Sequence, residues 1–252
     1  MRHIKIGFLI FFFSMLLASP TQAETATEIV KKSDLKMRGL SSYTELTMQI
    51  VRPSWTREMR MKAWSKGQDY SLVLVTAPAQ EKGSSSLKRH KEMWNWVPAI
   101  ERIIKIAPSM LGQSWMGSDF TNDDLINQSS IVVDYTHKIL REEMYDKVMS
   151  WVIEARPLPD APVVWGRLVL WVSQRAYNQR KVVYYDEYDE LINTMSTYDV
   201  KTLGGREIPT RQEMQPADKP GQKTVMLLHR AEFDFDIPAT FFSLQNLKDL
   251  RI

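Results

Sequence analysis

Residues 91–125 read KEMWNWVPAIERIIKIAPSMLGQSWMGSDFTNDDL, and the fold that the sequence predicts is organised around this stretch. Its first part alternates Trp94 and Trp96 with other residues, so a strand here would place both indole rings on one face of a sheet. Pro98 ends that strand because proline cannot donate to a sheet ladder. Alternation resumes over residues 100–105, which predicts a second short strand beside the first.

The second part of the stretch predicts a loop followed by a helical turn. Two glycines bracket the bulky apolar pair Trp115–Met116, which indicates a mobile loop. The residues after it lead into a short helix with Thr121 or Asp119 as the N-cap, and acidic side chains follow in the first turn, where they suit the helix dipole. Tryptophan strands beside a flexible apolar loop lead us to the hypothesis of a gated apolar pocket.

Residues 1–23 have the pattern of an export signal. Arg2 and Lys5 form a basic start, an apolar run covers residues 6–17, and small residues precede the expected cleavage after Ala23. The apolar run is shorter than the roughly 20 residues that a membrane-spanning helix requires. We therefore expect a mature chain of residues 24–252, folded as one domain in the bacterial periplasm.

Composition narrows the class of protein further. Loss of the leader would lower the formal net charge from +3 to +1, and a nearly neutral exported protein is not expected to bind nucleic acid. The chain contains no cysteine, which excludes disulfides and a lipid anchor on an N-terminal cysteine. A chain of this length can bury enough apolar surface without disulfides.

Most of the remaining chain alternates with the period of a strand. Residues 24–39 predict a helix, and residues 238–250 predict another at the C-terminal end. Residues 78–86 read as a polar loop, and Gly204-Gly205 predicts a tight hairpin turn. We expect about ten or eleven antiparallel strands in a mainly β fold, either a curved sheet or a barrel. The segments with a strand pattern outside the opening stretch cover residues 45–50, 58–63, 70–76, 131–140, 147–154, 163–173, 180–185, 191–203, 206–214 and 222–235.

The sequence offers no catalytic or metal-binding pattern. The mature part holds three histidines, His90, His137 and His229, far apart and without the spacing of zinc ligands. The acidic run 186–190 lacks the glycine and spacing of a calcium loop and reads as an exposed hairpin tip. Pairing of Glu101 with a later aspartate, as in glycosidases, stays a minor alternative. We expect no enzyme, no metal and no cofactor.

The apolar side chains are the unusual feature, since the chain has 14 Met and 8 Trp, many of them on alternating strands. Methionine is flexible and polarisable, and it suits surfaces that accept irregular apolar partners. The pattern alone favours these residues as the filling of a barrel core over the lining of a hollow one. As candidate lining of an apolar cavity we select Trp55, Met59, Met61, Leu72, Leu74, Trp94, Trp96, Ile104, Trp115, Met116, Trp165 and Trp171.

Several segments of the chain resemble the LolA-like outer-membrane lipoprotein-sorting family, in its larger branch found beside RND-type exporters. The resemblance rests on residues 94–98, on Arg102-Ile103, on 107–109, and above all on the segment 116–121, Met-Gly-Ser-Asp-Phe-Thr. It implies an open antiparallel half-barrel with helices as a lid over an apolar cavity. With this resemblance, a hollow barrel becomes the favoured interpretation.

The resemblance also implies a function. We expect a monomeric periplasmic carrier or acceptor that binds the acyl chains of lipids or lipoproteins. The alternative is a binding protein that does not transport, either a sensor of envelope stress or a periplasmic adaptor to an inner-membrane RND-type exporter. An enzyme is the least favoured of the three.

Overall fold

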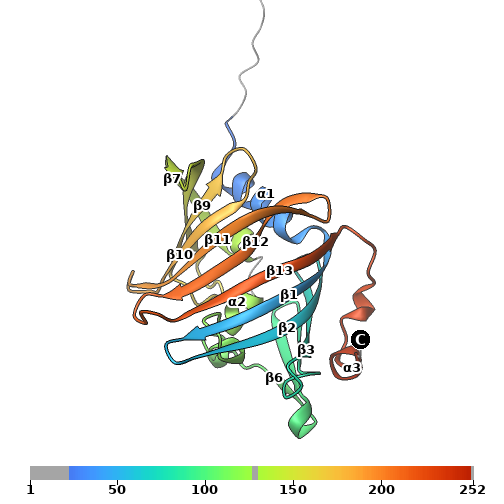
Figure 1. The fold of residues 1–252 in the computed structure, drawn as a ribbon. Coiled ribbons are helices and arrows are strands. Elements are labelled where there is room, and N and C mark those ends of the chain that lie inside the picture. Colours follow the sequence, from blue (N-terminus) through green and yellow to red (C-terminus); the bar gives the residue numbers. More distant parts are fainter. Residues whose placement is uncertain (1–22, 127–129, 251–252) are drawn as a thin grey trace, which may run out of the picture.

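In the computed structural model, which describes residues 23–126 and 130–250, the strands form a single antiparallel sheet. Within those residues the sheet has thirteen strands in the order β6-β5-β4-β3-β2-β1-β13-β12-β11-β10-β9-β8-β7. The two end strands, β6 and β7, do not pair with each other, so the sheet curves but stays open (Figure 1). The predicted leader lies outside the described residues apart from Ala23.

The strands follow one another mostly as hairpins. Their bounds are β1 (Ser41–Arg52), β2 (Trp55–Lys66), β3 (Tyr70–Ala77), β4 (Ser85–Arg89), β5 (Glu92–Val97), β6 (Arg102–Lys105), β7 (Tyr135–Tyr145), β8 (Val148–Pro157), β9 (Arg167–Ser173), β10 (Gln179–Tyr185), β11 (Leu191–Leu203), β12 (Arg206–Pro216) and β13 (Lys223–Phe233). The pairing of β1 with β13 brings the first and the last strand together at the centre of the sheet.

The helices are short, apart from the first. They are α1 (Ala26–Arg38), α2 (Asn122–Ile126) and α3 (Leu244–Asp249), with 3-10 turns η1 (Pro98–Ile100), η2 (Pro108–Met110), η3 (Trp115–Gly117), η4 (Ser130–Val132) and η5 (Ala239–Phe241). Helix α1 begins at a capping box between Thr25 and Glu28 and ends at Gly39, which has a φ of 67°. The helix that the sequence predicts over residues 24–39 is therefore observed.

The strand count corrects the expectation of ten or eleven. Strand β4, Ser85–Arg89, occupies part of the segment 78–86 that reads as a polar loop. Its serines have low strand propensity, but pairing with β3 and β5 on both sides satisfies its backbone. The Gly204-Gly205 turn is confirmed, because both glycines have positive φ, 55° and 76°.

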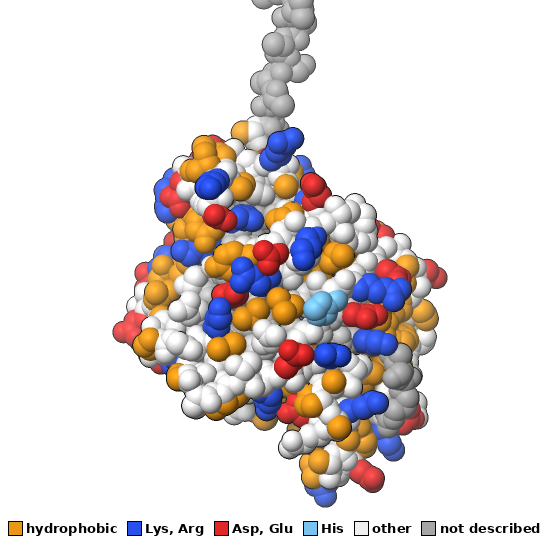
Figure 2. Space-filling model, viewed as in Figure 1, with side chains coloured by type: hydrophobic (Ala, Val, Ile, Leu, Met, Phe, Trp, Pro, Cys, Tyr) orange, Lys and Arg blue, Asp and Glu red, His pale blue; other side chains and the backbone are white. Residues whose placement is uncertain are grey.

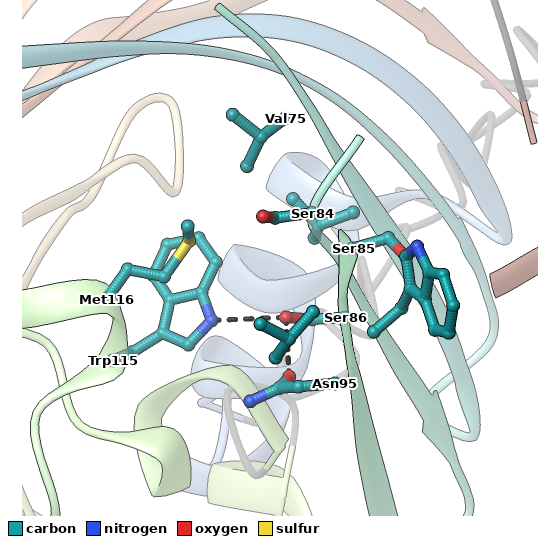
Figure 3. Close-up of a pocket in the computed structure, with 10 residues that line it drawn as sticks. Val75, Ser84, Ser85, Ser86, Asn95, Trp115 and Met116 are labelled. Carbon is teal, nitrogen blue, oxygen red and sulfur yellow. Dashed lines mark hydrogen bonds between the residues drawn. The ribbon is translucent and has the colours of Figure 1, made fainter. Parts of the chain in front are cut away.

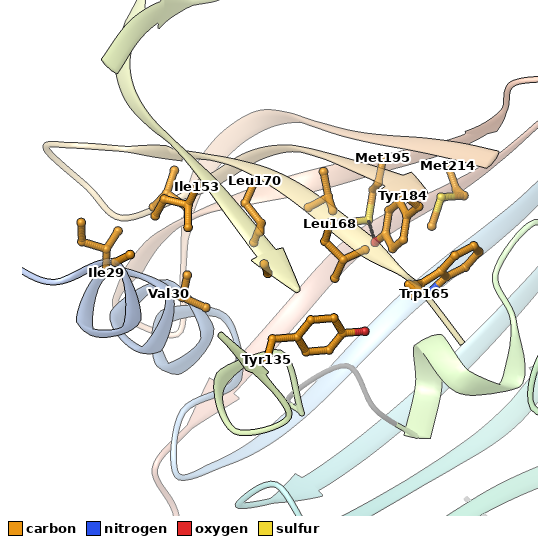
Figure 4. Packing of buried hydrophobic residues seen from close by; sticks show 14 of the residues in the cluster. Ile29, Val30, Tyr135, Ile153, Trp165, Leu168, Leu170, Tyr184, Met195 and Met214 are labelled. Carbon is orange, nitrogen blue, oxygen red and sulfur yellow. Dashed lines mark hydrogen bonds between the residues drawn. The ribbon is translucent and has the colours of Figure 1, made fainter. Parts of the chain in front are cut away.

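The concave face of the sheet carries two apolar clusters that cover its two halves. The first cluster lies under α1 and gathers side chains of β7 to β12. It extends from Ile153 and Leu170 near Ile29 of the helix to Met195 beside Tyr184 (Figure 4). The second lies over β1, β2, β3 and β5. Met226 of β13 packs against both clusters, so the apolar surface is continuous across the concave face.

The C-terminal segment covers the opposite face of β3 to β5. Phe242 and Leu247 are buried against Leu72, Leu87 and other side chains of these strands. In Figure 1 helix α3 accordingly lies outside the curve, while α1 and α2 lie within it. This half of the sheet is buried on both faces, which accounts for the nearly continuous apolar run of β3.

The exposed convex surface mixes charges of both signs. In the face that Figure 2 shows, basic and acidic side chains stand beside one another over the strands. Among the described residues, no helix has both the length and the apolar character needed to span a membrane.

Gly166 gives a test of the way β9 meets the loop after β10. A Cβ at this position would lie 2.3 Å from the carbonyl oxygen of Asp186, a backbone atom that cannot rotate away. We expect Gly166→Ala to lower the free energy of unfolding by about 2 kcal/mol or more, measured by urea denaturation. Gly112→Ala is the matched control, because its Cβ would meet an ordinary contact at 3.8 Å. Equal stability of the two variants would contradict the placement of Gly166.

Candidate functional site

The concave face of β1, β2, β3 and β5 is rich in methionine. Its buried members are Met48, Ile50, Met59, Met61, Val75 and Met93, and none of them is more than 2% exposed. In each of these strands successive side chains point to opposite faces of the sheet. The two-residue period of the strands therefore suffices to bring these side chains to the same face. Unbranched methionine side chains give this surface an adaptable shape.

A segment of the chain fills the concave face above these residues. We call residues 106–124 the cover segment; it runs from the end of β6 through η2 and η3 into α2. Ile106 and Trp115 of the cover segment are buried among the methionines, with Met110, Leu111 and Met116 packed beside them. Phe120 is buried in the other cluster, so one segment closes both halves of the face.

An ion pair fastens the middle of the cover segment to the rim of the sheet. The Arg52 guanidinium donates to both carboxylate oxygens of Asp119, at 3.1 Å and 3.0 Å, with side chains only 14% and 5% exposed. The Thr224 hydroxyl donates to the same carboxylate at 2.7 Å and accepts from the Asp119 backbone N–H at 2.9 Å. We call the contacts among Arg52, Asp119 and Thr224 the latch.

A second arginine, Arg57, holds the cover segment beside the latch and requires a glycine at position 117. Arg57 donates to the carbonyl of Met116 and, at 3.2 Å, to Glu81. Gly117 follows with a φ of 76°, and a Cβ there would lie 3.2 Å from the Arg57 guanidinium. The glycine therefore serves both the turn and the close approach of Arg57.

The far end of the cover segment is fixed to the other half of the sheet. The Asp124 carboxylate accepts from the Trp165 indole N–H at 2.9 Å and from the Thr121 backbone N–H at 2.7 Å. Burial raises the pKa of Asp124, and these hydrogen bonds act against the rise. Of the two predicted N-caps, Thr121 and Asp119, it is Thr121 whose hydroxyl accepts from the Asp124 N–H, at 3.1 Å.

A cavity of about 120 Å³ remains between the cover segment and the sheet. Val73 and Val75 of β3, with Trp115 and Met116, form its apolar side. Ser84, Ser86 and Asn95 give it a polar side (Figure 3), on which the Trp115 indole donates to Ser86 at 3.3 Å and Ser86 donates to Asn95 at 2.8 Å. Pockets for drug-sized ligands hold about 300 Å³ or more, so this space is small.

This cavity is smaller than the hollow that the resemblance to the LolA-like family predicts. The concave surface is apolar and continuous, as a lipid site requires, but the chain's own cover segment occupies it. Space for a long acyl chain would require the cover segment to move out.

Seven of the twelve predicted site residues lie on the concave side or in the cover segment. They are Trp55, Met59, Met61, Ile104, Trp115, Met116 and Trp165. Four of these, Met59, Met61, Trp115 and Met116, pack in one cluster. Trp55 is 50% exposed at the start of β2, and Ile104 is 38% exposed on the edge strand β6.

The other five predicted site residues lie on the convex face. They are Leu72, Leu74, Trp94, Trp96 and Trp171. Trp94 and Trp96 share a face, as alternation requires, but their indoles pack under the C-terminal segment. Trp96 is also one of the residues that line the cavity, although its side chain belongs to the cluster on the outer face. Alternation shows which residues share a face and leaves open which face is the inner one.

Sequence reasoning missed the polar part of the site. Arg52 lies between two expected strands, 45–50 and 58–63, and Thr224 lies within the expected strand 222–235. Their contact with Asp119 spans 67 and 105 positions of sequence, so no local pattern could reveal it. In the described part of the chain, no group of three or more His, Asp or Glu side chains is placed to hold a metal ion.

Comparison with known proteins agrees with this architecture. A family model described only as that of an uncharacterized protein matches residues 67–249. No curated protein matches the chain in sequence. Among solved structures, a LolA superfamily protein from Nitrosomonas europaea is 26% identical, with a TM-score of 0.76 over 88% of this chain and 98% of its own.

Two further solved structures share the fold. A DUF1329 family protein from Desulfovibrio piger is 24% identical, with a TM-score of 0.81 over 88% of this chain and 97% of its own. A domain named for outer-membrane lipoprotein sorting, from Vibrio parahaemolyticus, is 20% identical, with a TM-score of 0.77 over 88% of this chain and 98% of its own.

Removal of the latch tests how the cover segment is held. Asp119→Ala leaves the largely buried Arg52 without its carboxylate partner, which we expect to cost the closed state about 1–2 kcal/mol. The amides of Trp115 and Asn122, which bond within the cover segment, should then exchange with deuterium about tenfold faster. Glu232→Ala, which breaks an exposed pair with Arg230, is the control and should leave them unchanged. Unaltered exchange in Asp119→Ala would show that the latch does not hold the segment.

Proposed function

We propose that this chain, which belongs to the family whose model matches residues 67–249 and shares its fold with a LolA superfamily protein, is a periplasmic carrier or acceptor of lipid or lipoprotein acyl chains. The observation that carries the proposal is the methionine-rich concave face, covered by a segment of the chain itself and fastened by a polar latch. The acyl chain of the cargo takes the place of the cover segment on this face.

Exchange of cover for cargo is energetically feasible because both are apolar. Each methylene removed from water contributes about 0.8 kcal/mol, so ten methylenes contribute about 8 kcal/mol. Ile106, Trp115 and Phe120 lose a burial free energy on the same scale when they leave the sheet. The free energy gained by burying the acyl chain therefore largely offsets this loss, provided that the released side chains are buried elsewhere.

The latch then sets the balance between the closed and the open protein. A hydrocarbon chain cannot replace the hydrogen bonds that Asp119 accepts from Arg52 and Thr224. The two arrangements differ by this polar contribution, which keeps the empty protein closed and its apolar face away from water. Release of cargo restores the latch.

Export places the carrier between two membranes. The basic start and apolar run of residues 1–23 support secretion with cleavage after Ala23, and residues 24–252 act as one domain. Nothing in this role requires a catalytic group, and we propose that the protein is not an enzyme.

Bound lipid is the direct test of carriage. Organic extracts of gently purified protein should contain stoichiometric acyl lipid by mass spectrometry, and delipidated protein should take up a fluorescent acyl probe. Asp119→Ala should take up the probe about tenfold faster than the unaltered protein, because its cover segment opens more often. Protein that is consistently empty and takes up no probe in either form would rule out the carrier.

The position of the chain can be mapped by photocrosslinking. An acyl probe with a diazirine on its tail should label peptides of β1, β2 and β3 that hold Met48, Met61 and Val75. The aromatic residues Trp94 and Phe242 of the outer cluster serve as an internal control, because they lie on the other side of the sheet. Labelling confined to that outer cluster would show that the ligand does not bind to the concave face.

A further inference from the structure

The cavity beside Trp115 has a polar side with unused hydrogen-bond donors. Within the described residues, neither the Ser84 hydroxyl nor the side-chain amide nitrogen of Asn95 has a hydrogen-bond partner. Asn95 uses its oxygen to accept from Ser86, which in turn accepts from the Trp115 indole. In Figure 3, Ser84, which directly precedes β4, and Asn95 of β5 lie on the side of the sheet that faces Trp115 and Met116.

The cavity holds no charge to match an ion. Of the described residues that line it, all are Val, Ser, Asn, Trp or Met. The Arg57 guanidinium does not line the cavity, and its two terminal nitrogens donate to Glu81 and to the Met116 carbonyl. An ionised carboxylate or phosphate moved into this space would be desolvated without a counter-charge, which is strongly unfavourable.

The volume fits a linkage group and little more. Since a water molecule occupies about 30 Å³ of liquid, 120 Å³ has room for about four such groups. An ester or amide linkage, with its carbonyl and the first carbon of the chain, is of this size. The apolar side of the cavity, Val73 and Val75, continues into the methionine-rich concave face, where the rest of an acyl chain would lie.

We propose that this cavity recognises the uncharged carbonyl of an ester- or amide-linked acyl chain, with Ser84 and Asn95 as donors to the carbonyl oxygen. The inference rests on the proposed function and narrows its cargo, because it selects acylated lipids or acylated proteins and rejects free fatty acids. Part of the cavity exists before the cover segment opens, so the linkage site is preformed while the tail site is not.

The test compares three ligands of similar overall length that differ in their polar group. Methyl palmitate, palmitate and heptadecane, each supplied on cyclodextrin at pH 8, compete with a fluorescent acyl probe for the full mature chain. We expect methyl palmitate to bind about tenfold more tightly than either of the others, since each added hydrogen bond contributes a factor of a few to ten.

Two variants and a control separate recognition from folding. Ser84→Ala and Asn95→Leu should each reduce the preference for the ester about three- to tenfold, with unchanged circular dichroism spectra. Ser196→Ala is the matched control, because this hydroxyl lies on β11 away from the cavity, and it should keep the full preference.

The outcomes distinguish the inference from the function on which it rests. Equal or tighter binding of palmitate or heptadecane would overturn the carbonyl site and leave carriage intact, and so would an ester preference that survives in both variants. Absence of binding by all three ligands and by the probe would overturn both.

Discussion

The concave face of an open sheet has to be kept from water, and the cover segment, residues 106–124, does this here. Its apolar side chains bury the methionines of β1 and β2, and the carboxylate of Asp119 joins it to Arg52 and Thr224 on the rim. Apolar contacts of this kind can be exchanged for a lipid tail, but the directed hydrogen bonds cannot. Much of what we propose follows from this difference between exchangeable and non-exchangeable contacts.

The two faces of the sheet are covered by different kinds of chain segment. On the outside of β3 to β5, aromatic side chains such as Phe242 pack against Leu72 and Leu87, and the cover there is the end of the chain. On the inside, the cover is an internal segment with a glycine turn at 117 and polar contacts at defined points. An internal segment stays tethered at both ends when it opens, so it can close again after cargo leaves.

Much of the fold could be read from alternation, and the site could be read only in part. The period of two placed Met59 and Met61 together, and the caps of α1 and the Gly204-Gly205 turn were local signals. Which face of β5 points inward depends on how the C-terminal segment packs, so the inner position expected for Trp94 could not be checked from sequence. The latch joins residues far apart in sequence, and β4 is a strand because of its neighbours more than its composition.

The central claim is that the cover segment must leave the sheet before an acyl chain can bind. The chain has no cysteine, so a double variant, Asp119→Cys with Thr224→Cys, would carry one engineered disulfide across the latch. Uptake of a fluorescent acyl probe by this variant, oxidised and then reduced, tests the claim most directly, with Thr224→Cys alone as the control. The account predicts almost no uptake while the bond is intact and full uptake after reduction. Equal uptake in both states would show that cargo binds without opening of the cover segment.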